Sequence, residues 1–209
     1  SRGLGDVYKR QVYPQSFRDS NGDGIGDIPG ITEKLEYIQE LGCNALWINP
    51  CFTSPFYDAG YDVEDYYSVA PRYGTNEDLK KLFEAAHQRG MHVLLDLVPG
   101  HTAVTHPWFQ ESMKAEKNEY TDRYVWTDSL YKRMEDVKGI VSVLRGISPR
   151  PASCGVNCFS TQPALNYGFA NITDAGWQQP TDAPGPMATR EELKNIMRFW
   201  LTLGCDGFR

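Results

Sequence analysis

The stretch Thr75–Val98, TNEDLKKLFEAAHQRGMHVLLDLV, decides the fold class of this chain. It opens with Thr75-x-x-Asp78, a capping box in which two side chains three residues apart satisfy backbone N–H groups at a helix start. Apolar residues then recur at helical spacing as far as Gly90, a residue typical of helix ends. The apolar run His92–Val98 that follows predicts a buried strand. The stretch is therefore a helix that leads directly into a strand.

The same alternation extends on both sides of this stretch. Upstream, the sequence predicts a strand over Val12–Phe17, a helix over Ile31–Leu41 with Gly42 as its stop, and a strand over Ala45–Ile48. Downstream, residues 99–188 carry many prolines and no long period. A third helix is predicted to be capped by Thr189-x-x-Glu192, and a strand begins at Gly207. The apolar stripe expected for that helix consists of Leu193, Ile196, Met197, Trp200 and Leu201.

Strands that alternate with helices indicate an α/β fold with parallel strands and right-handed crossovers. Two architectures fit this pattern, a doubly wound sheet and a (β/α)₈ barrel. Both place their sites at the carboxyl ends of strands, so we expect the chemistry just after Phe17, Ile48, Val98 and Arg209.

Composition excludes several classes of protein. The 209 residues carry 21 Lys and Arg against 27 Asp and Glu, a net charge of −6, which argues against a protein that grips nucleic-acid phosphates. The longest apolar run, around Val93–Val98, is interrupted by Asp96 and is far shorter than the ~20 residues of a membrane helix. Aromatic residues make up 12% of the chain and could stack on ring-shaped ligands or fill a core.

The five cysteines are odd in number and scattered, which favours a reducing compartment and predicts a cytoplasmic protein. Cys154 and Cys158 lie four residues apart with no matching His or Cys pair nearby, so we expect free thiols rather than a zinc site.

The residues at the two ends of the chain indicate that the sequence is not a complete native protein. The run Asp6–Gln11, DVYKRQ, looks like the translation of a transposon-end adapter used in DNA library preparation, so residues 1–11 are expected to be non-native. At the other end, the chain stops at Arg209, at the start of a predicted strand. We therefore expect a fragment of a longer protein.

Acidic and amide side chains alternate with glycines in the loop between residues 19 and 30. Oxygen ligands stand at positions 1, 3, 5 and 9 of this loop, and a backbone carbonyl can serve as position 7. An EF-hand needs Glu at position 12, where this chain has Gly30, so that motif is excluded. The alternatives are an oxygen cage for Ca²⁺ or Mg²⁺ and a plain turn. The candidate ligands are Asp19, Asn21, Asp23, Ile25 and Asp27.

Further motifs follow the other predicted strands or lie near the end of the irregular stretch. They are GYDVEDY at residues 60–66, DLVPGHT at 96–102, HPWF at 106–109, QPALN at 162–166 and GFR at 207–209. In this order, and together with the acidic loop, they resemble glycoside hydrolase family 13, the α-amylase family, and most closely its oligo-1,6-glucosidase and α-glucosidase branch. The resemblance runs from about Val12 to Arg209. It implies a (β/α)₈ barrel, here residues 12–98 and 189–209, with a B domain inserted over residues 99–188.

The resemblance also implies a chemistry. Family members cleave or transfer at α-glucosidic bonds with retention, using a carboxylate nucleophile and a carboxylic acid/base. The nucleophile matches position 211, outside this chain, and the other two carboxylates follow it. The chain alone is therefore expected to be inactive.

Within the chain, the resemblance gives roles to four residues. Arg209 matches the arginine beside the nucleophile, and His101 matches the histidine that donates a hydrogen bond to the sugar at the cleavage point. Tyr61 matches the aromatic residue that stacks on that sugar. Asp62 matches an acid that accepts hydrogen bonds from terminal hydroxyls and so favours short saccharides. The plainer alternatives are a strand-end salt bridge for Arg209, a structural loop histidine for His101 and a surface turn for the Tyr-Asp pair. The acidic loop matches one that binds a structural Ca²⁺ or Mg²⁺.

Two departures from the family pattern limit these expectations. Gly100 stands where the family usually has an asparagine that ligates calcium, which argues against a calcium site between barrel and B domain. Ala164 stands where the branch usually has aspartate, so no linkage preference is predicted.

The expected substrate is an α-glucoside or a malto- or isomalto-oligosaccharide. The alternatives are a trehalose or isomaltulose synthase, a catalytically inactive relative that serves as a partner subunit, as in the heavy chains of amino-acid transporters, and a calcium-binding interaction module.

Overall fold

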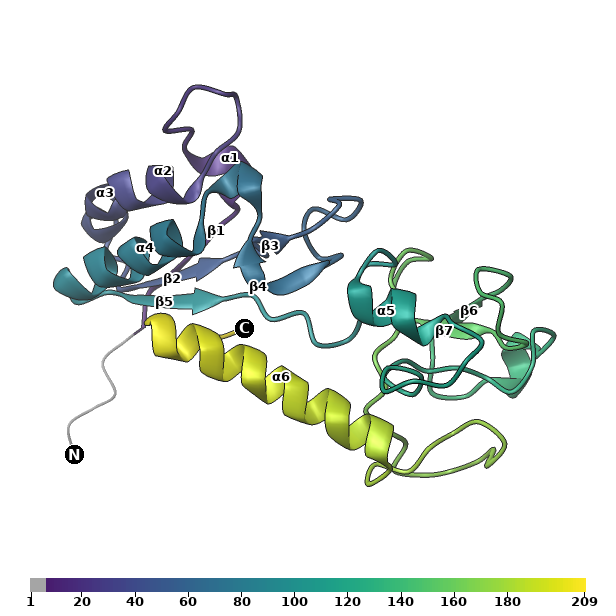
Figure 1. Cartoon of the computed structure of the whole chain (residues 1–209). Coiled ribbons are helices and arrows are strands. Elements are labelled where there is room, and N and C mark those ends of the chain that lie inside the picture. Colours follow the sequence, from purple (N-terminus) through teal and green to yellow (C-terminus); the bar gives the residue numbers. More distant parts are fainter. Residues whose placement is uncertain (1–6) are drawn as a thin grey trace, which may run out of the picture. The chain divides into compact units, whose positions relative to one another are not determined.

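The computed structural model describes residues 7–209 (Figure 1). These residues form two compact units. The first contains the described residues up to Thr53 together with Tyr66–Leu97 and Ile196–Arg209, and the second contains Ser54–Asp65 and Val98–Asn195. The expected B domain began at residue 99 and ended at residue 188. The second unit extends further, to Asn195, and also includes the earlier segment Ser54–Asp65.

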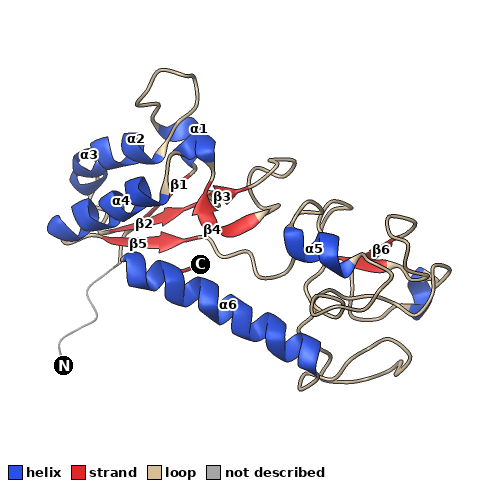
Figure 2. Cartoon of the chain, viewed as in Figure 1, coloured by secondary structure: helices blue, strands red, loops and turns tan. Residues whose placement is uncertain are grey.

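The first unit is built on a four-stranded parallel sheet, drawn in red in Figure 2. Its strands are β1 (Lys9–Val12), β2 (Ala45–Ile48), β5 (His92–Leu95) and β8 (Gly207–Phe208). They lie side by side in the order β1-β2-β5-β8, and every neighbouring pair is parallel. This order confirms the α/β class predicted from the alternation of helices and strands.

The helices of the first unit connect these strands. They are α1 (Pro14–Phe17), α2 (Ile28–Glu33), α3 (Leu35–Glu40), the 3₁₀ turn η1 (Pro71–Tyr73) and α4 (Asn76–Gln88), with the last turns of α6 (Pro184–Leu203). The predicted capping box is present, because the side chain of Thr75 accepts from the backbone of Asp78 and the side chain of Asp78 accepts from the backbone of Thr75. The apolar stripe of α4, expected from the sequence, is fully buried: Leu79, Leu82, Phe83 and Ala86.

The two faces of the parallel sheet differ in exposure. Side chains on one face, those of Leu46, Ile48, Val93 and Leu95, are completely buried. On the other face, the residues paired in register across β1, β2 and β5 are Gln11, Trp47 and Leu94, and all three remain partly or fully exposed. Asp96 and Arg209 continue this second face beyond the ends of β5 and β8, because side chains two residues apart share a face.

Several element boundaries differ from the sequence prediction. The strand expected at Val12–Phe17 is wrong, because β1 ends at Val12 and Pro14 opens the helix α1. The fixed φ of proline suits the first turn of a helix, where no backbone donor is needed. The helix expected at Ile31–Leu41 begins earlier, with Asp27 as N-cap, and is divided at Lys34 into α2 and α3. The strand at His92 ends at Leu95 rather than Val98.

The start of the last helix was also predicted wrongly. It begins at Pro184, so Thr189 lies inside α6, where its hydroxyl donates to the carbonyl of Gly185. Leu201, predicted for the apolar stripe, is 48% exposed, whereas Ile196 and Trp200 are buried as expected.

The second unit contains short elements and long connections. Its elements are α5 (Pro107–Ser112), the 3₁₀ turn η2 (Met134–Asp136), β6 (Ser142–Leu144) and β7 (Cys154–Val156), and β6 and β7 pair antiparallel. One apolar core is centred on stacked Phe109 and Trp126. A strand pair that was not predicted, β3 (Phe52–Thr53) with β4 (Asp65–Val69), belongs to the first unit except for Asp65.

Three remaining expectations concern the whole chain. None of the helices among residues 7–209 is long and apolar enough to cross a membrane. All five cysteines are free, and the cytoplasmic location inferred from them stays a prediction. Of the residues expected to be adapter-derived, 1–6 lie outside the described part, and Lys9–Gln11 form most of β1.

Candidate active site

Arg209, Asp96 and Trp47 meet at the carboxyl ends of β8, β5 and β2. The Arg209 guanidinium lies 4.5 Å from the centre of the Trp47 ring, and its Nη1 lies 3.8 Å from Oδ1 of Asp96. The other carboxylate oxygen of Asp96 accepts from the indole N–H of Trp47 at 3.2 Å. The Arg209 side chain is 57% exposed, whereas that of Asp96 is buried. The structure therefore holds a cation at the open strand ends, where the sequence predicted the site arginine.

Tyr61 and His101 lie together in the second unit. Nε2 of His101 is 2.9 Å from the backbone carbonyl of Tyr61, and Nδ1 is 3.0 Å from the amide nitrogen of Asn157. The imidazole is buried, and the Tyr61 side chain is partly exposed. Burial lowers the pKa of His101, against the opposing effects of the Tyr61 carbonyl and the Asp58 and Asp62 charges, so the ring is neutral near pH 7.

Asp62 does not have the accessibility expected of a residue that binds sugar hydroxyls. It is completely buried, and its carboxylate accepts from the Ser54 hydroxyl at 2.9 Å and from the backbone N–H groups of Tyr57 and Asp58 at 2.8 and 3.1 Å. These bonds hold a loop in which Phe56 and Ala59 have positive φ values of 61° and 51°. Such conformations cost energy and need support from their surroundings. Asp62 is therefore an anchor of this loop in the structure.

Asp58 is the partly exposed carboxylate of the same loop, and the sequence analysis did not single it out. Its Oδ2 accepts from Nε2 of the buried Gln162 at 2.5 Å, and its charge acts on His101. The sequence feature that could have pointed to Asp58 was its position two residues before Gly60, where the GYDVEDY motif begins. The positive φ values of the loop, which turn Asp58 and Asp62 to different surroundings, could not be read from residue types alone.

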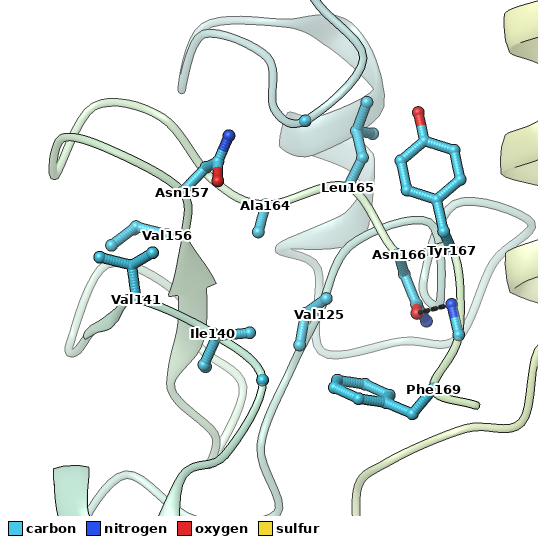
Figure 3. A pocket seen from close by; sticks show the side chains of 13 residues that line it. Val125, Ile140, Val141, Val156, Asn157, Ala164, Leu165, Asn166, Tyr167 and Phe169 are labelled. Atoms are coloured by element: carbon cyan, nitrogen blue, oxygen red, sulfur yellow. Dashed lines mark hydrogen bonds between the residues drawn. The ribbon is translucent and has the colours of Figure 1, made fainter. Parts of the chain in front are cut away.

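A cavity of about 490 Å³ opens beside Asn157 in the second unit (Figure 3). Its walls are mostly apolar and include Val125, Ile140, Val156 and Phe169. Gly100 also lines it, and a Cβ added to this glycine would lie 2.3 Å from the amide nitrogen of Asn157. The Asn157 side chain therefore takes the space that a side chain at position 100 would need.

The acidic loop is compact but does not gather its carboxylates into one cluster. Asp19 accepts from the backbone N–H groups of Asn21, Gly22 and Gly24, and these bonds lower its pKa. Asp27 is buried and caps α2, with Oδ1 on the N–H of Gly30 and Oδ2 on Ser20. Within residues 7–209 no three His, Cys, Asp or Glu side chains are placed to hold a metal ion. The donor set has the oxygen chemistry that Ca²⁺ and Mg²⁺ prefer.

The comparison with protein families decides between the architectures left open by the sequence. The profile of the alpha-amylase catalytic domain matches residues 11–209. The chain belongs to the α-amylase family. Of the two architectures, the (β/α)₈ barrel is therefore the correct one, and the four parallel strands are part of it.

Individual relatives have different activities at similar identity. The chain is 40% identical to the oligo-1,6-glucosidase of Parageobacillus thermoglucosidasius over 199 residues, which cover 95% of this chain and 33% of that protein. It is 42% identical to the trehalose synthase/amylase TreS of Mycolicibacterium smegmatis over 205 residues, 95% of this chain and 31% of that protein.

The solved structure of the trehalulose synthase MutB from Pseudomonas mesoacidophila MX-45 matches with a TM-score of 0.82 and 36% identity, and the match covers 97% of this chain and 34% of MutB. This α-amylase family chain thus spans about a third of the length of each of these proteins.

Proposed function

We propose that a full-length protein carrying this chain is a retaining α-glucosidase that acts on short α-glucosides. The observation that carries the proposal is the pairing of partly exposed Tyr61 with His101, next to the carboxylate of Asp58. A tyrosine ring offers an apolar plane to the CH face of a pyranose, and charged acceptors bind its hydroxyls strongly. In this proposal Asp58, rather than the buried Asp62, accepts hydrogen bonds from the sugar.

Arg209 would serve the reaction through its charge. Retaining glycosidases need one carboxylate that stays ionised as nucleophile and a second carboxyl group that protonates the leaving oxygen. A fixed guanidinium at the end of β8 lowers the pKa of a carboxylate placed beside it. The contact with the Trp47 ring and the proximity of Asp96 restrict where this guanidinium can lie.

The stereochemistry of the first product tests this proposal. The full-length protein is expected to hydrolyse p-nitrophenyl α-glucoside with retention, because two displacements at the same carbon restore its configuration. Proton NMR within the first minutes should detect α-glucose before mutarotation sets in. If β-glucose alone appeared first, the retaining assignment would be abandoned.

A second function, isomerisation or glucosyl transfer, is favoured by the identity to the trehalose synthase/amylase and the trehalulose synthase. In such a reaction a sugar hydroxyl replaces water in the second displacement. Incubation with maltose and with sucrose separates the two functions. A hydrolase releases free glucose in proportion to substrate consumed, whereas an isomerase forms a new disaccharide.

We also propose that the acidic loop binds one structural Ca²⁺ or Mg²⁺ through Asp19, Asn21, Asp23, Asp27 and the Ile25 carbonyl. Asp23→Ala in the full-length protein is expected to remove one bound divalent ion and lower the melting temperature, because a bound ion stabilises only the folded state. Elemental analysis and thermal unfolding measure both effects, and the pH–rate profile should not change. An unchanged ion count would show that the loop is an ordinary turn.

A further inference from the structure

Both ring nitrogens of His101 are engaged, and their partners fix its tautomer. A backbone carbonyl can only accept, so Nε2, 2.9 Å from the Tyr61 oxygen, carries the proton. An amide NH₂ group can only donate, so Nδ1, 3.0 Å from Nδ2 of Asn157, carries the lone pair. The three groups form a directional chain in which Asn157 donates to His101 and His101 donates to Tyr61.

The surroundings of Asn157 leave little freedom to this side chain. Its amide nitrogen fills the space over Gly100, where a Cβ would come within 2.3 Å. Its backbone N–H donates to the Gln162 carbonyl at 3.1 Å, and β7 ends at the preceding residue, Val156. His101 is itself joined to Ala164 by a β-bridge. Strand pairing on both sides therefore holds the donor and the acceptor at a fixed separation.

We propose that Asn157 is a positioning residue of the sugar site, which holds His101 as the Nε2–H tautomer and through it fixes the backbone of Tyr61. The inference rests on the proposed function for its effect on catalysis, but the tautomer itself can be measured without activity. Without the amide donor, the buried imidazole can rotate or take the Nδ1–H tautomer, which cannot donate from Nε2 to the Tyr61 carbonyl. The Tyr61 ring then loses the anchor that orients it toward a pyranose.

Asn157→Asp is the most informative variant, because a carboxylate in this place can only accept. To keep both bonds, His101 must then carry protons on both nitrogens, so the variant favours the imidazolium. Asp58 and Asp62 also face this ring and act in the same direction, whereas burial acts against the charge. The pKa of His101 should therefore rise in this variant, while the donation from Nε2 to the Tyr61 carbonyl is kept.

The experiment uses the full-length protein, labelled with ¹⁵N-histidine, in three forms: unchanged, Asn157→Asp and Asn157→Ala. The ring ¹⁵N shifts, assigned with His101→Gln, should report the Nε2–H tautomer in the unchanged protein and an imidazolium near pH 7 in Asn157→Asp. Asn157→Ala should lower kcat/KM about three- to tenfold, the usual effect of one lost hydrogen bond. The matched control is Asn171→Asp, the same change at an exposed position, which should leave both readouts unchanged.

The outcomes separate this inference from the proposed function. An Nδ1–H tautomer in the unchanged protein, or an Asn157→Asp variant whose His101 titrates as before, would overturn the role of Asn157. A protein with the expected tautomers but no turnover of any α-glucoside would leave the role of Asn157 in place and contradict the proposed function. Circular dichroism of each variant shows whether a loss of activity comes from a loss of fold.

Discussion

His101→Ala is expected to lower kcat/KM of the full-length protein by about 2–4 kcal/mol, roughly 30- to 1,000-fold, because it removes the group that holds the sugar-stacking residue in place. The structure gives the reason for an effect of this size. The buried imidazole donates from Nε2 to the Tyr61 carbonyl at 2.9 Å, so its removal frees the residue expected to stack on the sugar. Initial rates on p-nitrophenyl α-glucoside at substrate concentrations below KM measure the effect.

His106→Ala is the matched control, because His106 is a second buried histidine of the same unit. Its Nδ1 accepts from the backbone of Trp108 at 3.1 Å and caps α5, and burial lowers its pKa to about 4. Its removal should lower the melting temperature and leave kcat/KM within about threefold of the unchanged value. If His101→Ala and His106→Ala changed both quantities alike, His101 would be only structural.

The parts of the fold that were predicted correctly are those in which the capping and turn residues and the pattern of buried side chains indicate the same element. The start of α4 follows from Thr75 and Asp78, which satisfy each other's backbone, and β2 was placed at its correct bounds. The end of α4 follows from Gly90, whose φ is +69°. In such segments a few neighbouring residues determine the structure, so the sequence alone suffices.

Two of the wrong predictions concern prolines, and one acidic residue has a role in the structure that was not predicted for it. Pro14 was placed inside a predicted strand and Pro184 inside the irregular insertion, but both open helices, α1 and α6, where their missing donor costs nothing. Asp27 was interpreted as a metal ligand, and in the structure its carboxylate caps α2. The same carboxylate can ligate a metal ion or cap a helix, and only the position of the surrounding backbone shows which of these roles it has.

Prediction of the candidate site from the sequence was limited in a similar way, because its contacts join residues that are far apart in the chain. Tyr61 and His101 were named from motifs 40 residues apart, and the structure brings them together. Asn157 could not be named in advance, because its contact with His101 spans 56 residues and depends on the bare backbone of Gly100. The different surroundings of Asp58, which is partly exposed, and Asp62, which is buried, depend likewise on loop conformation rather than on residue type.

Residues 1–209 expressed alone should show no glycosidase activity and should aggregate. The nucleophile implied at position 211 and the two later carboxylates are not among these residues, so the groups present can at most orient a sugar. Within the described residues, β1 pairs only with β2 and β8 pairs only with β5, which leaves two strand edges open. Unpaired edges are templates for association between chains, and a closed barrel removes them.

The exposed face of the sheet also favours aggregation, because half-buried Trp47 and Leu94 lie on it beside exposed Gln11. Release of p-nitrophenol, size-exclusion chromatography and scanning calorimetry measure activity, association and cooperativity in one preparation, with the full-length protein at equal concentration as control. A sharp two-state transition from a monomer would show that the four strands and the second unit are stable without the remaining strands. Measurable turnover would mean that the catalytic carboxylates lie among these 209 residues, and that Arg209 does not adjoin the nucleophile.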